Sequence, residues 1–195
     1  MGFSTFLKKT WYFIWKDDSI LSWIVNVILA FVLVKFIIYP GIGFLLSTTH
    51  PLVAVVSSSM EHDGSFDSWW QSQSDWYDRN GISKEDFQFY RFKNGFNKGD
   101  IMILYGTKPK DIKKGDVIVF KSNQEDPIIH RVVRVYTEGN NIYFQTKGDH
   151  NPDSIKSLGE DRISQDDLIG RAVLRVPLLG WVKIIFTSII NMFSQ

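Results

Sequence analysis

Residues 116–147 read DVIVFKSNQEDPIIHRVVRVYTEGNNIYFQTK, and this stretch decides the expected fold. It contains three short runs of β-branched and aromatic residues, at 116–120, 128–136 and 141–147, separated by turn residues such as Gly139. Similar runs stand further out along the chain: PLVAVV (51–56), DIMILY (100–105) and LIGRAVLRV (168–176). Strands at this close spacing, without helices between them, predict a mainly β domain built as a sandwich or a partly open barrel.

The segment at about 62–96 interrupts this pattern, because it is polar, aromatic and almost free of β-branched residues. Asp67 is expected to cap a helix that continues through Arg79, and Ser83-x-x-Asp86 is typical of a capping box at the start of a second helix. We therefore expect a small helical insertion. Its tryptophans either lie at the lipid headgroup level or pack a small core of their own. These tryptophans are Trp69, Trp70 and Trp76.

The N-terminal part contains a long apolar segment, ILSWIVNVILAFVLVKFIIY (20–39), in which seventeen of twenty residues are apolar. About 20 helical residues cross a hydrocarbon layer of roughly 30 Å. The run is longer than the roughly 7–15 apolar residues of a cleaved signal peptide, and no clear small-x-small site follows it. We expect an uncleaved transmembrane anchor at 20–46, with Pro40 and Gly41 ending the regular helix.

The lysines predict how the anchor is oriented. Lys8, Lys9 and Lys16 precede the apolar segment, whereas Lys35 and Arg79 are separated by a stretch without Lys or Arg. The positive-inside rule therefore predicts that the N-terminus lies in the cytoplasm and that everything after residue 46 lies outside. We expect a single-pass protein of the plasma membrane.

The parts on either side of the anchor follow from this orientation. Residues 1–19 are expected to be cytoplasmic, with an aromatic-rich amphipathic stretch along the inner membrane surface. Residues 47–177 would form the extracytoplasmic β domain. A C-terminal membrane-associated helix is expected at 178–195, because LLGWVKIIFTSIINMF (178–193) is apolar but rather short for a span. It carries a narrow polar stripe, so an interfacial helix, a helix packed on a partner's membrane helix and a core helix all remain open. The stripe consists of Lys183, Thr187 and Asn191.

Composition removes several kinds of chemistry. The 195 residues include no cysteine, which excludes disulfides, thiolate metal sites, iron–sulfur clusters and a cysteine nucleophile. With 22 basic and 21 acidic residues, the chain has no global basic field, and no nucleic-acid partner is expected. A metal site built from His150 and the neighbouring acids lacks the usual ligand spacing, so no metal and no cofactor are expected.

Three features are candidates for chemistry. A hydroxyl cluster, Ser57-Ser58-Ser59, follows an apolar strand; His130 lies within the apolar run 128–136; and an acidic loop spans 148–153. Each feature also has a structural explanation: the serines are typical of a polar strand end, the histidine of a half-buried structural residue, and the acidic loop of a solvated turn. In this order along the chain they supply the three roles of a Ser-His-Asp system: an attacking hydroxyl, a base and an orienting carboxylate.

The same residues fall into ordered boxes, and the chain resembles type I signal peptidases of the archaeal and endoplasmic-reticulum branch, which use histidine as the base. The matching boxes are Ser57-Ser58-Ser59-Met60-Glu61, Lys98-Gly99-Asp100-Ile101, Lys114 to Phe120, Ile129-His130-Arg131-Val132, Thr146-Lys147-Gly148-Asp149-His150-Asn151 and Ile169-Gly170-Arg171-Ala172. The resemblance implies a signal-peptidase-like β fold with an N-terminal transmembrane helix, a small helical insertion and a C-terminal apolar helix. His62 stands where the family commonly has proline.

The resemblance also implies roles for individual residues. Ser59 would be the nucleophile, and its backbone N–H, with the Ser57 hydroxyl, would hold the oxyanion. His130 would be the base, and Asp153 would orient its imidazole. Two other carboxylates are weaker alternatives for the acid, Asp149 first and Asp161 after it. Lys121 is the alternative base.

The activity implied is that of a membrane-bound serine endopeptidase that removes signal peptides from exported preproteins after small-x-small sites, through an acyl-enzyme. Its expected partners are signal peptides, the lipid bilayer and the protein translocation channel. Two other hypotheses stay open. The chain could be a non-catalytic membrane-anchored β module or assembly subunit, or it could cleave itself, as in the related fold of self-processing repressors.

Overall fold

The computed structural model of the protein describes residues 2–193, and it divides into two compact units, Met1–Leu45 and Leu46–Gln195. Several side chains of the last helix are outside the described part. They include Lys183, Thr187 and Asn191, so the expected polar stripe of that helix lies outside the described residues.

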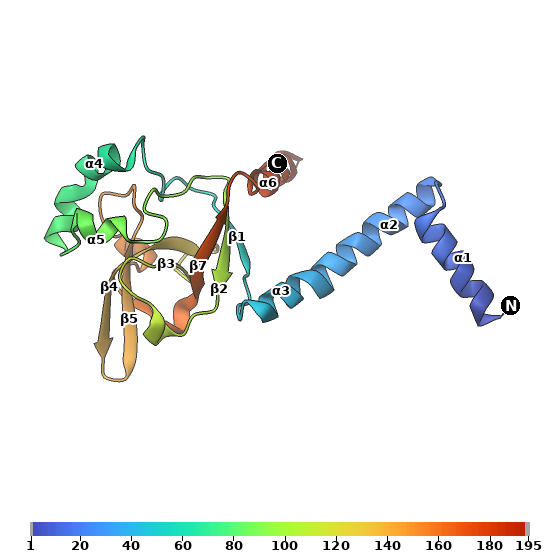
Figure 1. The fold of residues 1–195 in the computed structure, drawn as a ribbon, viewed down its shortest axis with the longest axis horizontal. Coiled ribbons are helices and arrows are strands. Elements are labelled where there is room, and N and C mark those ends of the chain that lie inside the picture. Colours follow the sequence, from blue (N-terminus) through green and yellow to red (C-terminus); the bar gives the residue numbers. More distant parts are fainter. Residues whose placement is uncertain (1, 194–195) are drawn as a thin grey trace. The chain divides into compact units, whose positions relative to one another are not determined.

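The first unit is helical, and its two helices are joined by polar contacts (Figure 1). α1 (Phe3–Trp15) precedes the long apolar helix. The Ser22 hydroxyl of the apolar helix donates to the Phe13 carbonyl, and the Asn26 amide donates to the Ile14 carbonyl at 2.8 Å. The last carbonyls of a helix have no partner within that helix. The two polar side chains of the apolar helix therefore satisfy the end of α1.

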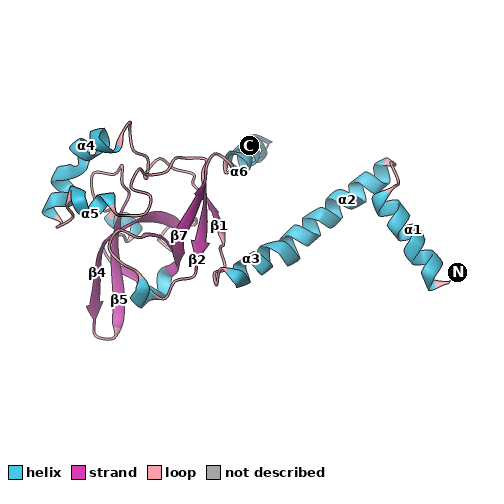
Figure 2. Ribbon diagram, viewed as in Figure 1, coloured by secondary structure: helices cyan, strands magenta, loops and turns pink. Residues whose placement is uncertain are grey.

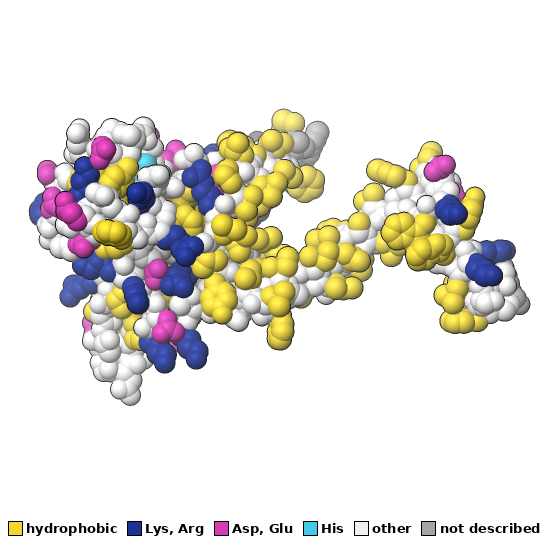
Figure 3. Space-filling view, viewed as in Figure 1, with side chains coloured by type: hydrophobic (Ala, Val, Ile, Leu, Met, Phe, Trp, Pro, Cys, Tyr) yellow, Lys and Arg dark blue, Asp and Glu magenta, His cyan; other side chains and the backbone are white. Residues whose placement is uncertain are grey.

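The apolar helix is continuous from Ile20 to Leu45, has a mean hydropathy of 2.5, and is 6% buried over its most apolar window. Apolar side chains line it (Figure 3). Among the described residues it is the one helix long and apolar enough to cross a membrane. It consists of α2 (Ile20–Leu33), a π-helical turn (Val34–Ile38) and α3 (Tyr39–Leu45).

The expectation that this helix ends at Pro40 is wrong. A proline ring normally clashes with the carbonyl four residues earlier and removes one hydrogen bond of the helix. Here the Tyr39 N–H donates to the Val34 carbonyl, five residues back, within the π-helical turn. Such a turn widens the helix locally and rearranges its hydrogen bonds. The proline is thereby accommodated, and the helix continues through Leu45.

The second unit is built on one curled, fully antiparallel sheet of seven strands in the order β1-β2-β7-β3-β4-β5-β6 (Figure 2). The strands are β1 (Leu52–Ala54), β2 (Ile101–Tyr105), β3 (Val117–Phe120), β4 (Ile128–Glu138), β5 (Asn141–Lys147), β6 (Ile163–Ser164) and β7 (Leu168–Val176). Five of them lie within the runs expected from the sequence, β4 continues two residues beyond its expected run 128–136, and the mainly β class with an N-terminal helix is confirmed. β6 was not expected, since two residues give no periodic signal.

The sheet register places the candidate base near the middle of the sheet. On β4, His130 pairs with Ile118 of β3, and Arg131 pairs with Lys147 of β5. Successive side chains of a strand point to opposite faces. His130 and Arg131 therefore belong to opposite faces of the same strand. β1 is an edge strand, with β2 as its one neighbour in the sheet.

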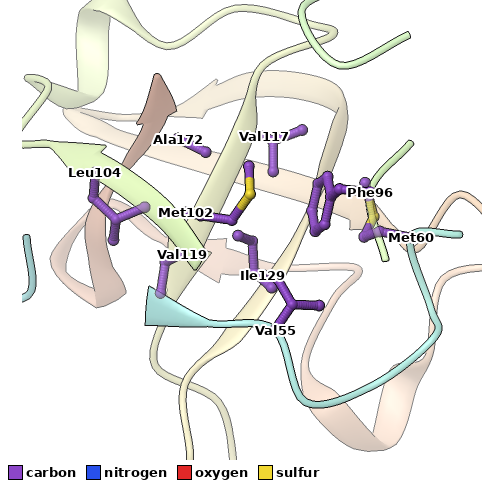
Figure 4. Packing of buried hydrophobic residues seen from close by; sticks show 9 residues of the cluster. All are labelled: Val55, Met60, Phe96, Met102, Leu104, Val117, Val119, Ile129 and Ala172. Atoms are coloured by element: carbon purple, nitrogen blue, oxygen red, sulfur yellow. The ribbon is translucent and has the colours of Figure 1, made fainter. Parts of the chain in front are cut away.

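One hydrophobic cluster lies directly behind the candidate nucleophile. Met60 and Phe96 are fully buried in it, next to Val55 (Figure 4). The Phe96 N–H donates to the Met60 carbonyl at 3.0 Å. The methionine that follows Ser59 is therefore a core residue, and burying it fixes the chain on which Ser59 stands.

The insertion forms two helices, α4 (Phe66–Arg79) and α5 (Lys84–Gln88), beside the sheet (Figure 1). The capping box at Ser83 is confirmed, whereas the cap of α4 is Ser65 and not Asp67. The tryptophans pack a core of their own and do not form an exposed surface. Trp69 is 2% exposed, Trp70 is 6% exposed and Trp76 packs against them; Tyr77, Ile82, Phe87 and Val133 complete this cluster.

The last helix is α6 (Trp181–Phe193), which starts later than the apolar run does. The Gly180 N–H donates to the Gly99 carbonyl at 2.8 Å, and the Leu178 N–H donates to the Asp100 carboxylate at 3.0 Å. The Gly-Asp turn before β2 thus holds the start of this segment. Of the three alternatives for this helix, the structure does not support a core helix, because several apolar side chains of α6 are exposed. They are Val182, Ile185, Phe186 and Met192.

Candidate active site

Ser59 stands in a tight turn just beyond the edge strand β1. The Glu61 N–H donates to the Ser58 carbonyl at 3.0 Å and closes this turn. From the loop after β5, the His150 N–H donates to the Ser59 carbonyl at 2.9 Å. Two segments far apart in the sequence therefore hold the backbone of Ser59.

The Ser59 hydroxyl meets the candidate base. Its Oγ lies 2.8 Å from Nε2 of His130, which is 3% exposed. The Ser57 Oγ lies 3.1 Å from the same hydroxyl. Of the expected site residues, the structure thus brings Ser57, Ser59 and His130 together, in the arrangement that a general base and a hydroxyl nucleophile require.

The carboxylate at the other nitrogen of the imidazole is Glu160. Its Oε1 is hydrogen-bonded to Nδ1 of His130 and accepts a bond from the Thr146 hydroxyl at 3.0 Å. Its Oε2 accepts the Ile155 N–H at 2.6 Å, and the side chain is fully buried. A carboxylate with this many donors is held in one orientation, which in turn fixes the imidazole ring.

Asp153, expected to orient the imidazole, does not contact His130. Its exposed carboxylate accepts the Trp76 indole N–H at 2.9 Å and the Ser154 N–H at 2.7 Å. The weakest alternative, Asp161, is also exposed. The loop after β5 turns away from His130 at Asp153 and returns through a 3₁₀ turn (Lys156–Leu158) that delivers the next buried carboxylate, Glu160.

Asp149, the first alternative to Asp153, is buried and binds Arg131 instead of His130. Its oxygens accept from the guanidinium at 2.8 Å and 2.7 Å, from the Tyr77 hydroxyl at 3.1 Å and from the His62 imidazole at 3.0 Å. Burial by itself raises the pKa of Asp149, but Arg131 and His62 outweigh it and hold this pKa well below its usual range. Asp149 is therefore an ionised structural anchor of the loop next to Ser59.

The helical insertion covers this loop. The Trp69 indole N–H donates to the Asp149 carbonyl at 3.3 Å and the Trp69 ring stacks on His62, with 3.6 Å between centroids. The Lys147 ammonium donates to Gln73 of α4 at 3.1 Å. With the Trp76 bond to Asp153 and the bonds of His62 and Tyr77 to Asp149, five side chains of the insertion are hydrogen-bonded to residues 147–153. The insertion was expected from the sequence, but its contact with the loop 147–153 was not.

Lys147 makes a testable contribution to stability. Burial lowers the pKa of this fully buried ammonium to about 8, only partly offset by nearby carboxylates, against an ordinary value of 10.5. Between these pH values the folded protein releases a proton that the unfolded chain retains, so stability rises with pH. We expect the free energy of unfolding to increase from pH 8 to pH 10 by up to about 3 kcal/mol. Urea unfolding at several pH values measures this, and the increase should be absent in Lys147→Met. Parallel curves for both proteins would contradict the assignment.

Lys121, the alternative base, lies elsewhere. Its side chain is exposed, and its backbone N–H donates to the Asp167 carbonyl at 2.9 Å. Among the described residues, no group of three or more His, Asp or Glu side chains is arranged to hold a metal ion. His150 has one acidic neighbour, Asp63, at 3.6 Å.

A cavity of about 410 Å³ adjoins the Ser59 hydroxyl. One wall is β1 with the chain up to Ser59, and the other is the loop 124–127 with the start of β4. The lining is partly apolar, with Val53, Val56 and Ile129. The cavity can therefore receive a small apolar side chain of an extended peptide that lies along the edge strand.

Comparison with known proteins agrees with these features. No family model matches the chain. It is 36% identical over 98 residues to the "Signal peptidase complex catalytic subunit SEC11C" of Canis lupus familiaris and of Homo sapiens. That match covers 48% of this chain and 51% of the relatives, so the chain matches about half the length of these proteins. It is 26% identical over 158 residues to the "Signal peptidase complex catalytic subunit SEC11" of Fusarium vanettenii, covering 78% of this chain and 73% of the relative.

The resemblance expected from the order of the boxes is thereby confirmed: the relatives of this chain are catalytic subunits of the signal peptidase complex.

Proposed function

We propose that this protein is a membrane-bound serine endopeptidase that removes signal peptides from preproteins. The observation that carries the proposal is the chain of hydrogen bonds from the half-buried Ser59 through His130 to the buried Glu160. The relatives named as signal peptidase catalytic subunits support the substrate class.

In the proposed reaction, Ser59 Oγ attacks the carbonyl carbon of the scissile bond while Nε2 of His130 takes the hydroxyl proton. The resulting imidazolium is stabilised by its hydrogen bond to the Glu160 carboxylate. The tetrahedral oxyanion is held by the Ser59 N–H and the Ser57 hydroxyl. His130 then gives its proton to the leaving amine, the C–N bond breaks, and the acyl-enzyme remains to be hydrolysed.

The substrate binds as an added strand along β1. In an extended peptide, the residues one and three positions before the cleaved bond point to the same side. Both side chains then face the wall formed by β1 and the loop 124–127, along the cavity next to Ser59. The resemblance to signal peptidases implies small residues at these two positions. The side chain between them points away.

The helix Ile20–Leu45 serves as the membrane anchor, with the N-terminus in the cytoplasm and the β domain on the outer side of the plasma membrane. Its length, its hydropathy and the lysines before it support this assignment. Such an anchor keeps the site close to the region where signal peptides emerge from the bilayer and from the translocation channel.

Substrate variants test this function. The full-length chain in lipid nanodiscs is expected to cleave a preprotein with alanine one and three residues before the bond, with the new N-terminus read by mass spectrometry. Phenylalanine directly before the bond should lower kcat/KM by about 100-fold or more, because the proposed function requires a small residue at this position. Phenylalanine two residues before the bond is the matched control and should have little effect. Equal cleavage of both variants, or cleavage at another bond, would contradict the proposal.

A further inference from the structure

Within the described part of the chain, three buried side-chain nitrogens have no hydrogen-bond partner: His62 Nδ1, Asn151 Nδ2 and Arg175 Nε. A buried polar atom without a partner is uncommon and indicates a missing water or a role in function. Arg175 Nε faces the Asp100 carboxylate at 2.7 Å and is thus in an ion pair. His62 belongs to the network around Asp149. The Asn151 amide remains, and it lies beside the candidate active site.

The position of this amide follows from Gly148. A Cβ atom built on Gly148 would lie 2.6 Å from Asn151 Nδ2, 2.8 Å from the Ser59 carbonyl oxygen and 2.9 Å from His130 Nε2. These three atoms therefore surround one point, and only glycine leaves them room to approach. The Asn151 N–H donates to the Gly148 carbonyl at 2.9 Å, so a tight turn fixes where the amide stands.

The Asn151 amide lies outside the wall of the cavity that adjoins the Ser59 hydroxyl. The cavity next to Ser59 is lined by β1, by the loop 124–127 and by the start of β4, and the loop 148–151 is not part of its wall. In the proposed reaction the acyl part of the substrate occupies that cavity. The leaving amine departs on the other side of His130, and water must approach there for Nε2 to take its proton.

We propose that the Asn151 amide donates a hydrogen bond to the water molecule that hydrolyses the acyl-enzyme, an inference that rests on the proposed function. The water donates one proton toward His130 Nε2 and accepts the amide N–H, which leaves a lone pair free for the acyl carbon. As its oxygen bonds to that carbon, His130 takes the proton. The bond from the carbon to Ser59 Oγ then breaks, and His130 returns the proton to Ser59. A water molecule that is already oriented in the site reacts faster than a freely moving one, because the entropy cost of orienting it has been met before the reaction.

Asn151→Ala separates the two halves of the reaction. Rapid-quench experiments with the full-length chain in nanodiscs should show release of the mature product at nearly the wild-type rate, followed by deacylation about 10- to 100-fold slower. Mass spectrometry should then find an acyl group accumulating on Ser59. Hydroxylamine, a small and strong nucleophile, should restore turnover by accepting the acyl group. The melting temperature should not change, because no partner of this amide exists among the described residues.

Asn140→Ala, at the exposed turn between β4 and β5, is the matched control and should leave both rates unchanged. Equal slowing of acylation and deacylation, or a lowered melting temperature without accumulation of the acyl-enzyme, would overturn the role of Asn151. If the wild-type protein never carries an acyl group on Ser59 and Ser59→Ala still cleaves, the proposed function itself is wrong.

Discussion

Cleavage of a preprotein is expected to fall by at least about 10³-fold when Ser59 is replaced by alanine. The hydroxyl is the one nucleophile within hydrogen-bond reach of His130 Nε2, at 2.8 Å, among the described residues. Without it, no acyl-enzyme forms, and only uncatalysed attack by water remains. Single-turnover cleavage of a fluorescent preprotein by protein in nanodiscs measures the loss.

The neighbouring serines provide graded controls for this prediction. Ser58→Ala removes an exposed hydroxyl of the same turn and should keep nearly full activity. Ser57→Ala removes a proposed oxyanion donor and should lower kcat by about 10²-fold, with KM nearly unchanged. If Ser59→Ala retained activity close to that of Ser58→Ala, the serine mechanism would be excluded.

Replacing Glu160 by glutamine is expected to lower kcat by about 10²- to 10⁴-fold. The amide has the shape of the carboxylate but no charge, so it cannot stabilise the imidazolium that forms when His130 accepts a proton. An amide NH₂ directed at Nδ1 would also favour the wrong tautomer. Steady-state kinetics on the preprotein measure the effect, and circular dichroism checks that the variant is folded.

Asp153→Asn is the matched control, because this exposed carboxylate also has an indole and a backbone N–H as partners. We expect it to cleave within about twofold of the wild-type rate, in the range typical of exposed side chains away from the reacting atoms. Loss of activity in Asp153→Asn together with normal activity in Glu160→Gln would return the acid role to Asp153.

Most of the β domain could be predicted from local pattern. Short runs such as 116–120 and 141–147 are dense in β-branched and aromatic residues and end at turn residues, so their strand character needs no distant partner. The capping box at Ser83 is equally local. By contrast, the continuation of the first helix past Pro40 depends on a π-helical turn, and its altered hydrogen bond from Tyr39 to Val34 has no sequence signature.

The candidate site, like the fold, has residues that local sequence predicts and others that it does not. Ser59 and His130 each stand in a box that can be recognised along the chain, and their catalytic roles stay predictions. The carboxylate could not be chosen in this manner, because several acids follow Gly148 within a few residues of one another. Glu160 directly follows the turn residue Gly159 and precedes another acid, Asp161, so its local sequence gives only a weak signal.

Local sequence patterns predict six of the seven strands, the apolar helix and the order of serine, histidine and acid, because periodicity and turn chemistry act over a few residues. Packing of the whole domain brings Glu160 to His130 and Asp149 to Arg131, and it buries Trp69 and Trp70 of the insertion. Those contacts depend on where a loop returns to the sheet and on which charges can be buried together. Which carboxylate binds which donor is therefore set by packing across the whole domain, because a buried carboxylate is stable only when it is hydrogen-bonded or paired with a positive charge.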